Sequence, residues 1–355
     1  MILDSVTTKP RGLQVSVGGR ATFKRTSLIC AGLFLALVIV IVLMALLGSE
    51  KLPAQSAVCA LLSFGKQSCG LTSDQSAILF DIRLPRILLG AAVGASLAVA
   101  GASYQSLLRN PLAEPYLLGI SNGAAVGTMV ALVFLGANEW SRPLLAFAGA
   151  LLATLLVYRL AQGRTGASPE RLILAGVIVT TFLSSGIVFV TTLMDATRIR
   201  SFTFWLLGDL SGTTSKLLWL ALFIAIAGTV VLTAHARSLN LLMLGERDAF
   251  DLGVEVSRVR LVVFVVASLL VGSSVASSGS VGYVGLVVPH LMRLSLGSDN
   301  RITVPAAAIC GAIFVVVADT LARTLIAPRE LPVGAITALI GAPLFVYLLR
   351  RRQRN

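Results

Sequence analysis

The sequence predicts an all-α polytopic membrane protein with ten transmembrane helices. Of the 355 residues, 56% are hydrophobic and only 13% are charged, whereas a soluble chain of this length carries about a quarter charged residues. The apolar residues gather into long runs, and a helix needs roughly 20 such residues to cross a bilayer. The 32 glycines agree with this class, because small residues allow membrane helices to approach closely.

Ten apolar runs define the expected spans. The first follows Lys24 and Arg25 and is too long for the apolar core of a signal peptide, so we interpret it as an uncleaved helix. The runs cover residues 28–48, 84–107, 116–136, 142–162, 171–194, 215–235, 259–277, 281–296, 302–322 and 332–349. The chain therefore divides into a polar N-terminal tail (1–26) and one membrane domain (27–355).

Basic residues are concentrated on one side of these spans. The net charge of +13 could suggest nucleic-acid binding, but most Lys and Arg residues fall in the two tails and in alternate loops. The positive-inside rule places that side in the cytoplasm. Both termini are then cytoplasmic, which requires an even number of spans, and no nucleic-acid partner is expected.

Two of the four cysteines, Cys59 and Cys69, lie in the first loop on the opposite side. A disulfide is allowed there if the loop faces an oxidising compartment, and two free thiols fit the sequence equally well. Cys30 and Cys310 lie within spans, where we interpret them as packing residues.

The sequence shows no machinery for a reaction of its own. It contains no G-x-x-x-x-G-K-[ST] phosphate loop, no H-E-x-x-H and no C-x-x-C motif, and its only histidines are His235 and His290. We therefore expect no catalytic residue, cofactor or metal in this chain. Energised work would then draw on a partner chain or on an ion gradient.

One acid, Asp319, lies clearly in the middle of a span. Transporters driven by ion gradients usually carry buried acids, so Asp319 could belong to a proton relay. Arg323 follows one turn later and can pair with it on one helix face. We favour a structural ion pair near the outer end of the helix.

Glycines recur at intervals of three or four residues in two regions. Gly279, Gly282 and Gly285 belong to the eighth run, and Gly119, Gly123 and Gly127 to the third. Such spacing makes a smooth helix face that a neighbouring helix can approach. We interpret both sets as packing surfaces.

Five segments follow one another with a characteristic order and spacing. They are RLPRILLGAAVGASLAVAGASYQSLLRNPLAEPYLLGISNGAAVG (83–127), FWLLGDLSG (204–212), LGERDAFDLGV (244–254), GSVGYVGLVVPHLMR (279–293) and ELPVGAITALIGAPLF (330–345). Together they closely resemble the permease subunits of type II ABC importers, the FecCD-like family that carries haem, ferric siderophores and cobalamin. The resemblance covers nearly the whole chain after the tail and implies the ten-helix type II permease fold.

The resemblance also implies partners and a location. The expected assembly contains a second copy of this chain, two cytoplasmic ABC ATPase subunits that bind ATP and Mg, and a periplasmic substrate-binding protein. It would lie in the lipid of the bacterial inner membrane. The missing phosphate loop agrees with this division of labour.

Two partner surfaces follow from matched positions. Arg83, Arg86 and Arg323 match arginines that pair with glutamates of the binding protein, and exposed guanidinium groups suit such docking. The alternative is that they lie at the lipid headgroups. The inner loop 237–256 matches the coupling helices that contact the ATPase. Its matched residues are Gly245, Glu246, Ala249, Leu252 and Gly253.

The segment RNPLAEP is a rigid break between the second and third spans. Pro111 prevents helix continuation and pushes Asn110 toward an extended backbone, while Pro115 can open the next helix. In the family, Asn110 and Leu112 match positions of a cytoplasmic gate, whereas a tight turn is the alternative. The loop before the fifth span, GASPER, would form a companion gate. It carries Pro169 and Glu170 where cobalamin members have small hydroxyl residues.

Family architecture also places the fifth and tenth spans along the transport pathway. The candidate pathway residues there are Ser184, Ser185, Thr191, Thr192 and Thr337. The alternative for the hydroxyl groups of the fifth span is that they bond to carbonyls of their own helix.

Arg198 and Arg200 stand at the outer end of the fifth span. Doubled in a dimer, they would favour an anionic cargo, unless they only balance Asp195 and Asp209. We therefore expect haem as the cargo, followed by a ferric siderophore and then by cobalamin. A secondary transporter driven by an ion gradient is the alternative of a different class.

Overall fold

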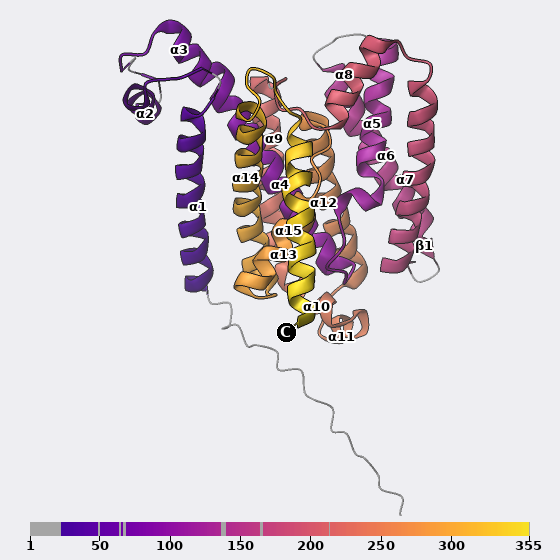
Figure 1. The fold of residues 1–355 in the computed structure, drawn as a ribbon. Coiled ribbons are helices and arrows are strands. Elements are labelled where there is room, and N and C mark those ends of the chain that lie inside the picture. The colour runs from indigo at the N-terminus through magenta and orange to yellow at the C-terminus, as the bar shows by residue number, and fades with distance from the viewer. Residues whose placement is uncertain are drawn as a thin grey trace, which may run out of the picture.

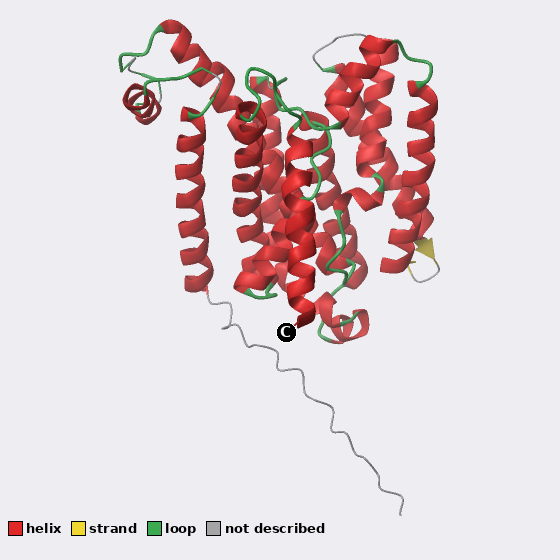
Figure 2. Cartoon of the chain, in the orientation of Figure 1, coloured by secondary structure: helices red, strands yellow, loops and turns green. Residues whose placement is uncertain are grey.

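In the computed structural model the chain is a bundle of helices that run side by side, with loops at two opposite ends (Figures 1 and 2). The structure describes residues 23–354 except 49, 64, 67, 68, 136–139, 164, 165 and 213. Most of the predicted tail thus lies outside the described residues. We call the end with α2, α3 and α8 the upper end, and the end with α10 and α11 the lower end, as Figure 1 draws them.

The described elements follow the predicted order. The first half comprises α1 (Phe23–Leu46), α2 (Ala54–Leu62), α3 (Ser73–Ala77), the π-helix η1 (Ile78–Arg83), α4 (Leu84–Leu107), the 3-10 helix η2 (Pro115–Leu118), α5 (Ile120–Val130), the π-helix η3 (Ala131–Leu135) and α6 (Ser141–Ala161). A two-residue hairpin, β1 (Gln162–Gly163) with β2 (Gly166–Ala167), precedes α7 (Pro169–Thr191). The second half comprises α8 (Ala196–Leu206), α9 (Ser215–Ala234), α10 (Ala236–Leu244), α11 (Glu246–Asp251), α12 (Val256–Ser278), α13 (Val284–Leu296), α14 (Asn300–Thr324) and α15 (Val333–Arg354).

Each of the ten predicted runs corresponds to a helix or a broken helix. Among the described residues, seven helices are long and apolar enough to cross a membrane, and three shorter apolar helices complete the set of ten. The shorter ones are Ile120–Leu135, Val284–Leu296 and Val333–Leu348. α1 begins at Phe23, so the predicted boundary at residue 26 falls inside the first helix. The start of α1 and the end of α15 lie at the same, lower end (Figure 1).

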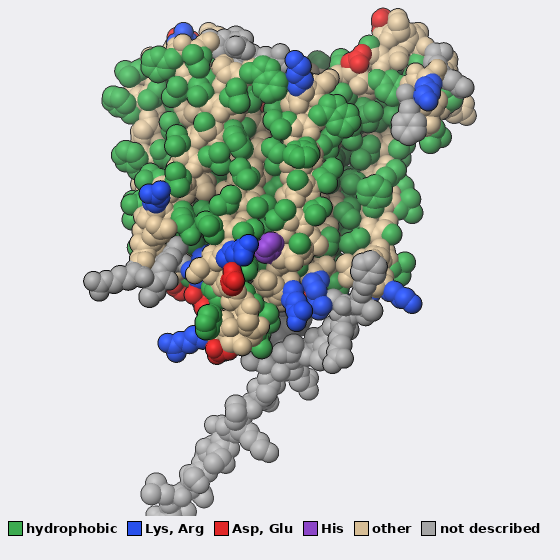
Figure 3. Space-filling model, turned by 180° about the vertical axis from the view of Figure 1, so that it is seen from behind, with side chains coloured by type: hydrophobic (Ala, Val, Ile, Leu, Met, Phe, Trp, Pro, Cys, Tyr) green, Lys and Arg blue, Asp and Glu red, His purple; other side chains and the backbone are tan. Residues whose placement is uncertain are grey.

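The side chains agree with a membrane environment. Hydrophobic side chains cover the middle height of the face drawn in Figure 3, and most of the charged ones gather toward its two ends. This distribution is expected because a charged side chain is costly in the hydrocarbon core of a bilayer and favourable near water.

α4 is the central helix of the bundle, and nearly all of its residues are buried. Two glycines allow backbones to touch it. A Cβ built on Gly101 would lie 1.9 Å from the carbonyl oxygen of Gly285, and one built on Gly94 would lie 2.1 Å from that of Gly311. α13 and α14 therefore approach α4 at distances that only glycine permits.

The third span is an interrupted helix, in which Gly119 adopts a left-handed conformation with φ 75° between η2 and α5. A non-helical segment joins the seventh span to the short eighth: α12 ends at Ser278, and α13 begins only after Gly279 (φ 67°) and Tyr283 (φ 67°). α13 therefore begins a few residues after the predicted start at residue 281.

The two groups of regularly spaced glycines were predicted to form helix faces for packing, and only some of their members do so. Gly123 and Gly127 pack on α6, where a Cβ would lie 2.3 Å from the Gly149 oxygen and 1.9 Å from the Leu145 oxygen respectively. Gly279 instead caps α12, and Gly282 precedes α13. This set is therefore not one continuous helix face, because residues 279–283 are not helical. Gly279 and Gly285 still pack closely, since a Cβ would lie 1.9 Å from the Trp205 oxygen and 2.9 Å from the Leu97 oxygen respectively.

An appendage formed by α2, α3 and η1 extends sideways at the upper end (Figure 1). A disulfide joins Cys59 to Cys69 in it, with an S–S distance of 2.05 Å. Of the two alternatives left open by the sequence, the structure shows the disulfide. Cys30 and Cys310 are free thiols of intermediate exposure.

Candidate functional site

The RNPLAEP segment forms a tight turn at the lower end of α4. The side-chain oxygen of Asn110 accepts a hydrogen bond from the Leu112 N–H at 2.9 Å, and the Asn110 carbonyl accepts one from Ala113 at 3.0 Å. Arg109 has a positive φ of 49°. The local geometry is thus that of a tight turn, the alternative to a gate that the sequence left open. Leu112 in this turn has 47% of its surface exposed.

Beyond the turn, Glu114 and η2 bind the non-helical segment between α12 and α13. The Glu114 carboxylate accepts a hydrogen bond from the Tyr283 N–H at 3.0 Å. The Tyr116 hydroxyl accepts one from the Val281 N–H and donates one to the Val281 carbonyl, both at 3.0 Å. These side chains satisfy backbone groups that non-helical segments would otherwise leave bare in the membrane. Sequence reasoning missed this pair, although an acid inside an apolar stretch was an available signal.

The companion loop lies beside the turn. Ser168 caps α7 by accepting a hydrogen bond from the Arg171 N–H at 3.4 Å, and Pro169 occupies the first helical position. Glu170 is exposed and lies within electrostatic reach of Arg109 and Arg260. The structure therefore brings the two predicted gate segments together at the lower end.

The fifth-span hydroxyl groups lie on α7, which is only 17% buried. The Ser185 hydroxyl donates a hydrogen bond to the Thr181 carbonyl at 3.0 Å, and the Thr191 hydroxyl donates one to the Val188 carbonyl at 2.7 Å. Both hydroxyl groups therefore bond to carbonyls of their own helix, which was the alternative to a pathway role. Thr192 does the same toward Phe189 at 2.7 Å.

Two other predicted pathway residues have different surroundings. Ser184 accepts a 2.6 Å hydrogen bond from Asn122 on α5. Thr337, in contrast, is fully buried and donates to the Gly334 carbonyl at 3.0 Å. Its role in the pathway stays a prediction.

α8 carries the two outer arginines at the upper end. Arg198 and Arg200 are both exposed, and Arg198 pairs with Asp195 at 3.2 Å, with both side chains about half exposed. Arg198 also borders a hollow of about 430 Å³ between α5, η3 and α7. Apolar side chains form its walls, among them Met129, Phe134 and Phe182.

The three predicted docking arginines are buried, which corrects the expectation of exposed guanidinium groups. Arg83, Arg86 and Arg323 expose only 4%, 8% and 6% of their surface. Arg83 donates to the carbonyl oxygens of Ala45 and Glu50. In the single chain the three arginine side chains thus bind groups of the same chain.

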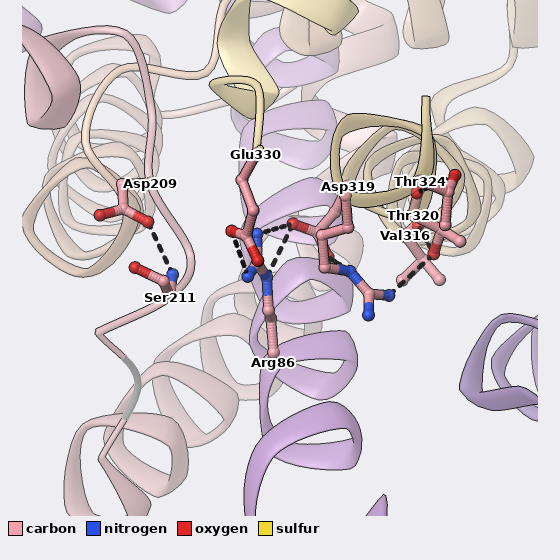
Figure 4. A network of polar contacts seen from close by, with 9 residues as sticks. Arg86, Asp209, Ser211, Val316, Asp319, Thr320, Thr324 and Glu330 are labelled. Carbon is pink, nitrogen blue, oxygen red and sulfur yellow. Dashed lines mark hydrogen bonds and ion pairs between the residues drawn. The ribbon is translucent and has the colours of Figure 1, made fainter. Parts of the chain in front are cut away.

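Arg86 binds the acids Asp319 and Glu330 (Figure 4), and Arg323 shares Asp319 with it. Arg86 lies 2.9 Å from Asp319 and 2.8 Å from Glu330, and Arg323 lies 3.1 Å from Asp319. The predicted structural ion pair of Asp319 is therefore present, with a second arginine that the sequence did not indicate. Glu330 comes from the loop before α15, and its side chain is 47% exposed.

The inner loop forms two short helices, α10 and α11, at the lower end. Gly245 (φ 141°) separates them and Gly253 (φ 84°) ends the second, so both glycines have conformations that other residues avoid. Ala249 is fully buried, whereas Phe250 and Leu252 are 71% and 61% exposed. Glu246 forms an ion pair with Arg260, which fixes α11 to α12.

In the described part of the chain, seven helices of membrane-spanning length and three shorter apolar helices make this chain a multi-pass membrane protein. Within the described residues, no group of three or more His, Cys, Asp or Glu side chains is placed to hold a metal.

Residues 35–351 match the FecCD transport family, and the chain belongs to that family. It is 43% identical to the cobalamin import system permease protein BtuC of Halobacterium salinarum over 284 residues, which are 80% of this chain and 76% of the relative. It is 38% identical to the hemin transport system permease protein HmuU of Yersinia pestis over 331 residues, 91% and 97% of the two chains.

A solved structure described as an inward-facing conformation of a metal-chelate type ABC transporter has the same fold. The TM-score is 0.80 at 31% identity, and the match covers 91% of this chain and 99% of that one. The chain is thus an ABC importer permease with the type II fold. Membership of this family implies a permease dimer and ATPase partners.

Proposed function

We propose that this chain is the permease of an ATP-driven importer that carries haem from the periplasm to the cytoplasm across the bacterial inner membrane. The ATP and Mg sites belong to two partner ATPase subunits, and this chain has no ATPase site of its own. A second copy of the chain completes the pathway, and a periplasmic binding protein delivers the cargo at the upper end.

The observation that carries the choice of cargo is the arginine-bordered apolar hollow at the upper end. Haem combines a flat apolar ring with two carboxylates. Arg198 and Arg200 supply exposed positive charge on α8, and the hollow beside Arg198 supplies apolar walls. Arginine suits carboxylates because its planar fork can bind both oxygens. A relative named as a hemin permease, 38% identical over 91% of this chain, supports the same choice.

Cobalamin is the second candidate. The relatives named as cobalamin or vitamin B12 permeases include one at 43% identity and one from Vibrio cholerae at 38% over 93% of this chain. Cobalamin is nearly neutral overall, so exposed arginines would help its capture less. A ferric siderophore with anionic character would share the arginine requirement.

The orientation rests on two observations. Both described ends of the chain lie at the lower end (Figure 1), where the positive-inside rule places the cytoplasm. The Cys59–Cys69 disulfide lies in the upper appendage, and disulfides persist in oxidising compartments such as the periplasm.

The cargo is tested with the complete transporter in proteoliposomes. ATP hydrolysis is measured with the binding protein loaded with haem, with a ferric siderophore or with cobalamin. Stimulation and uptake by haem alone support the proposal. A response to cobalamin alone would overturn the cargo while leaving the importer assignment intact.

Removing both upper-end arginines should lower haem capture. We expect Arg198→Gln with Arg200→Gln to reduce the rate of haem uptake on the order of tenfold at low salt, because charges that steer a ligand act mainly on association. Uptake rates at two salt concentrations provide the measurement. Lys216→Gln, which removes an exposed positive charge from the start of α9, is the control and should leave uptake near the wild-type rate.

Shortening Leu112 should loosen the lower gate. Leu112 is half-exposed, so Leu112→Ala should leave the fold intact while it widens the turn that we propose closes the pathway. We expect cargo efflux without ATP to rise several-fold, as measured from preloaded proteoliposomes. Leu117→Ala truncates a leucine of similar exposure, 43%, on the adjacent η2, and tight vesicles with both variants would contradict the gating role.

A further inference from the structure

A buried polar cluster ties α10 to three helices of the bundle at the lower end. We call it the lower-end hub; its side chains are Ser106, Asn240, Arg293, Asp299 and Asn300. On the α10 side, Asn240 donates to Asp299 at 2.7 Å and accepts a 2.8 Å hydrogen bond from the Asn300 N–H. Asn300 also contacts the sulfur of Met243 on α10 at 3.6 Å.

The other side of the hub reaches α13 and α4. One terminal nitrogen of Arg293 donates to the Asn300 side-chain oxygen at 3.1 Å, to the Ser106 hydroxyl at 2.9 Å and to the Ala102 carbonyl at 3.0 Å. The single proton of the Ser106 hydroxyl has two acceptors within reach, the Ala102 carbonyl at 2.9 Å and the Asn300 side-chain oxygen at 3.0 Å. The Asn300 side chain therefore joins α10 to both other helices.

In the hub, the positively charged Arg293 side chain is hydrogen-bonded to neutral acceptors of Ala102, Ser106, Ser298 and Asn300. Ser106 and Asn300 are completely buried, and within the part of the chain that the structure describes no carboxylate forms an ion pair with Arg293. Burying a charge is costly unless it is paired or hydrogen-bonded. Arg293 is thus positioned by the hydrogen bonds of the hub, and losing one of them leaves a charge short of acceptors.

Asp299 joins the hub to the surface. Partial burial opposes its ionisation, but hydrogen bonds from Arg301 and Asn240 outweigh burial and bring the pKa of this carboxyl below its usual range. Asp299 therefore stays an acceptor for Asn240 at neutral pH.

The hub continues directly into the gate turn. The Arg109 N–H donates to the Ser106 carbonyl at 3.3 Å, and the Asn110 N–H donates to the Gln105 carbonyl at 3.1 Å. Beside them lies a cavity of about 300 Å³, lined by Arg109, Pro111, Met243 and Arg293 among others. It provides room for Met243 and Arg293 to change position when α10 moves.

We propose that Asn300 and Arg293 are positioning residues that transmit movement of α10 and α11 to the turn at residues 109–112. The inference rests on the proposed function, in which α11 is the contact surface for the ATPase. α10 and α11 are separated by Gly245 alone, so displacing α11 displaces Asn240 as well. Because Asn240 binds the Asn300 backbone and Asn300 binds Arg293 and Ser106, the displacement reaches the end of α4.

A relay differs from a merely structural cluster in what its loss changes. Loss of structural support lowers transport and ATP hydrolysis together, because fewer complexes assemble. Loss of the relay lowers the amount of cargo moved for each ATP hydrolysed.

The test is a double-mutant cycle at the two ends of the hub. Asn240→Ala, Ser106→Ala and the double variant are reconstituted as complete transporters, and uptake and ATP hydrolysis are measured in the same proteoliposomes. Asn240 and Ser106 have no hydrogen bond to each other. We expect each single variant to lower cargo per ATP about fivefold and the double variant to be no worse, because members of one network are not additive.

Several outcomes would overturn the inference. An unchanged cargo-to-ATP ratio would overturn it, and so would a double variant whose loss, about 25-fold, is the product of independent effects. Where Ser106→Ala does not assemble, Arg293→Lys replaces it in the cycle, since it keeps the charge but not the fork of donors. Lys216→Gln, which removes an exposed positive charge outside the hub at the start of α9, is the control and should keep the wild-type ratio.

The proposed function is tested by the wild type in the same vesicles. Wild-type complexes that show no ATP-driven uptake of any of the three cargoes would overturn the proposed function and the relay together. Normal wild-type uptake with unaltered ratios in the variants would overturn the relay alone.

Discussion

Asp319→Ala is expected to prevent accumulation of folded protein. Asp319 exposes 1% of its surface and lies between Arg86 and Arg323, which are also buried. Removing one partner of a buried ion pair costs about 3–5 kcal/mol, because the remaining charge is left uncompensated. Here two guanidinium groups would share only the half-exposed Glu330, which pairs with Arg86.

The measurement is the yield of monodisperse protein in detergent and its unfolding temperature. Asp81→Ala is the matched control, since Asp81 is an exposed acid in η1 near the same end of α4. We expect its unfolding temperature to stay within error of the wild type. An Asp319→Ala variant with wild-type yield and unfolding temperature would contradict the stabilising role of this ion-pair cluster.

Phe250→Asp is expected to abolish binding of the ATPase subunits. Phe250 projects from α11 with 71% of its surface exposed, beside Leu252 and above the fully buried Ala249. An exposed aromatic on a short helix fixed by Glu246 and Arg260 is a suitable anchor for a pocket on a partner. Truncating such an anchor typically costs about 2 kcal/mol or more, and a carboxylate placed in an apolar pocket adds a desolvation cost.

Copurification of the ATPase with tagged permease provides the measurement. Because Phe250 is exposed, the variant should fold and keep the unfolding temperature of the free permease. Phe250→Leu keeps an apolar side chain and should retain the ATPase. Full ATPase recovery with Phe250→Asp would move the contact surface away from α11.

The buried arginines change how the upper end is understood. The sequence places Arg86 and Arg323 at span ends, where exposure and docking to glutamates are reasonable expectations. The structure shows Arg86 bound to Asp319 and Glu330, residues more than 230 positions away in the chain. The docking role remains a prediction, and it now requires that a partner carboxylate compete with Glu330 for Arg86.

The local sequence was sufficient for most of the fold. Run length and composition located ten helices to within a few residues, for example α4 at Leu84–Leu107 and α9 at Ser215–Ala234. In a bilayer each helix satisfies its own backbone, so its existence depends on consecutive residues alone. The family membership followed from five contiguous segments for the same reason.

What the sequence by itself determined, then, is the membrane class, the helices, the break at RNPLAEP and the family. Only the tertiary structure decided that the segment 279–283 between α12 and α13 is not helical, that Glu114 and Tyr116 bind this segment, and that the upper-end arginines are buried. It alone also assembled the lower-end hub, in which Asn240 and Asn300 belong to helices 60 residues apart. The physical reason is that a polar side chain within a membrane protein takes its partner from whichever helix packs against it, and helix packing is not encoded in any one segment.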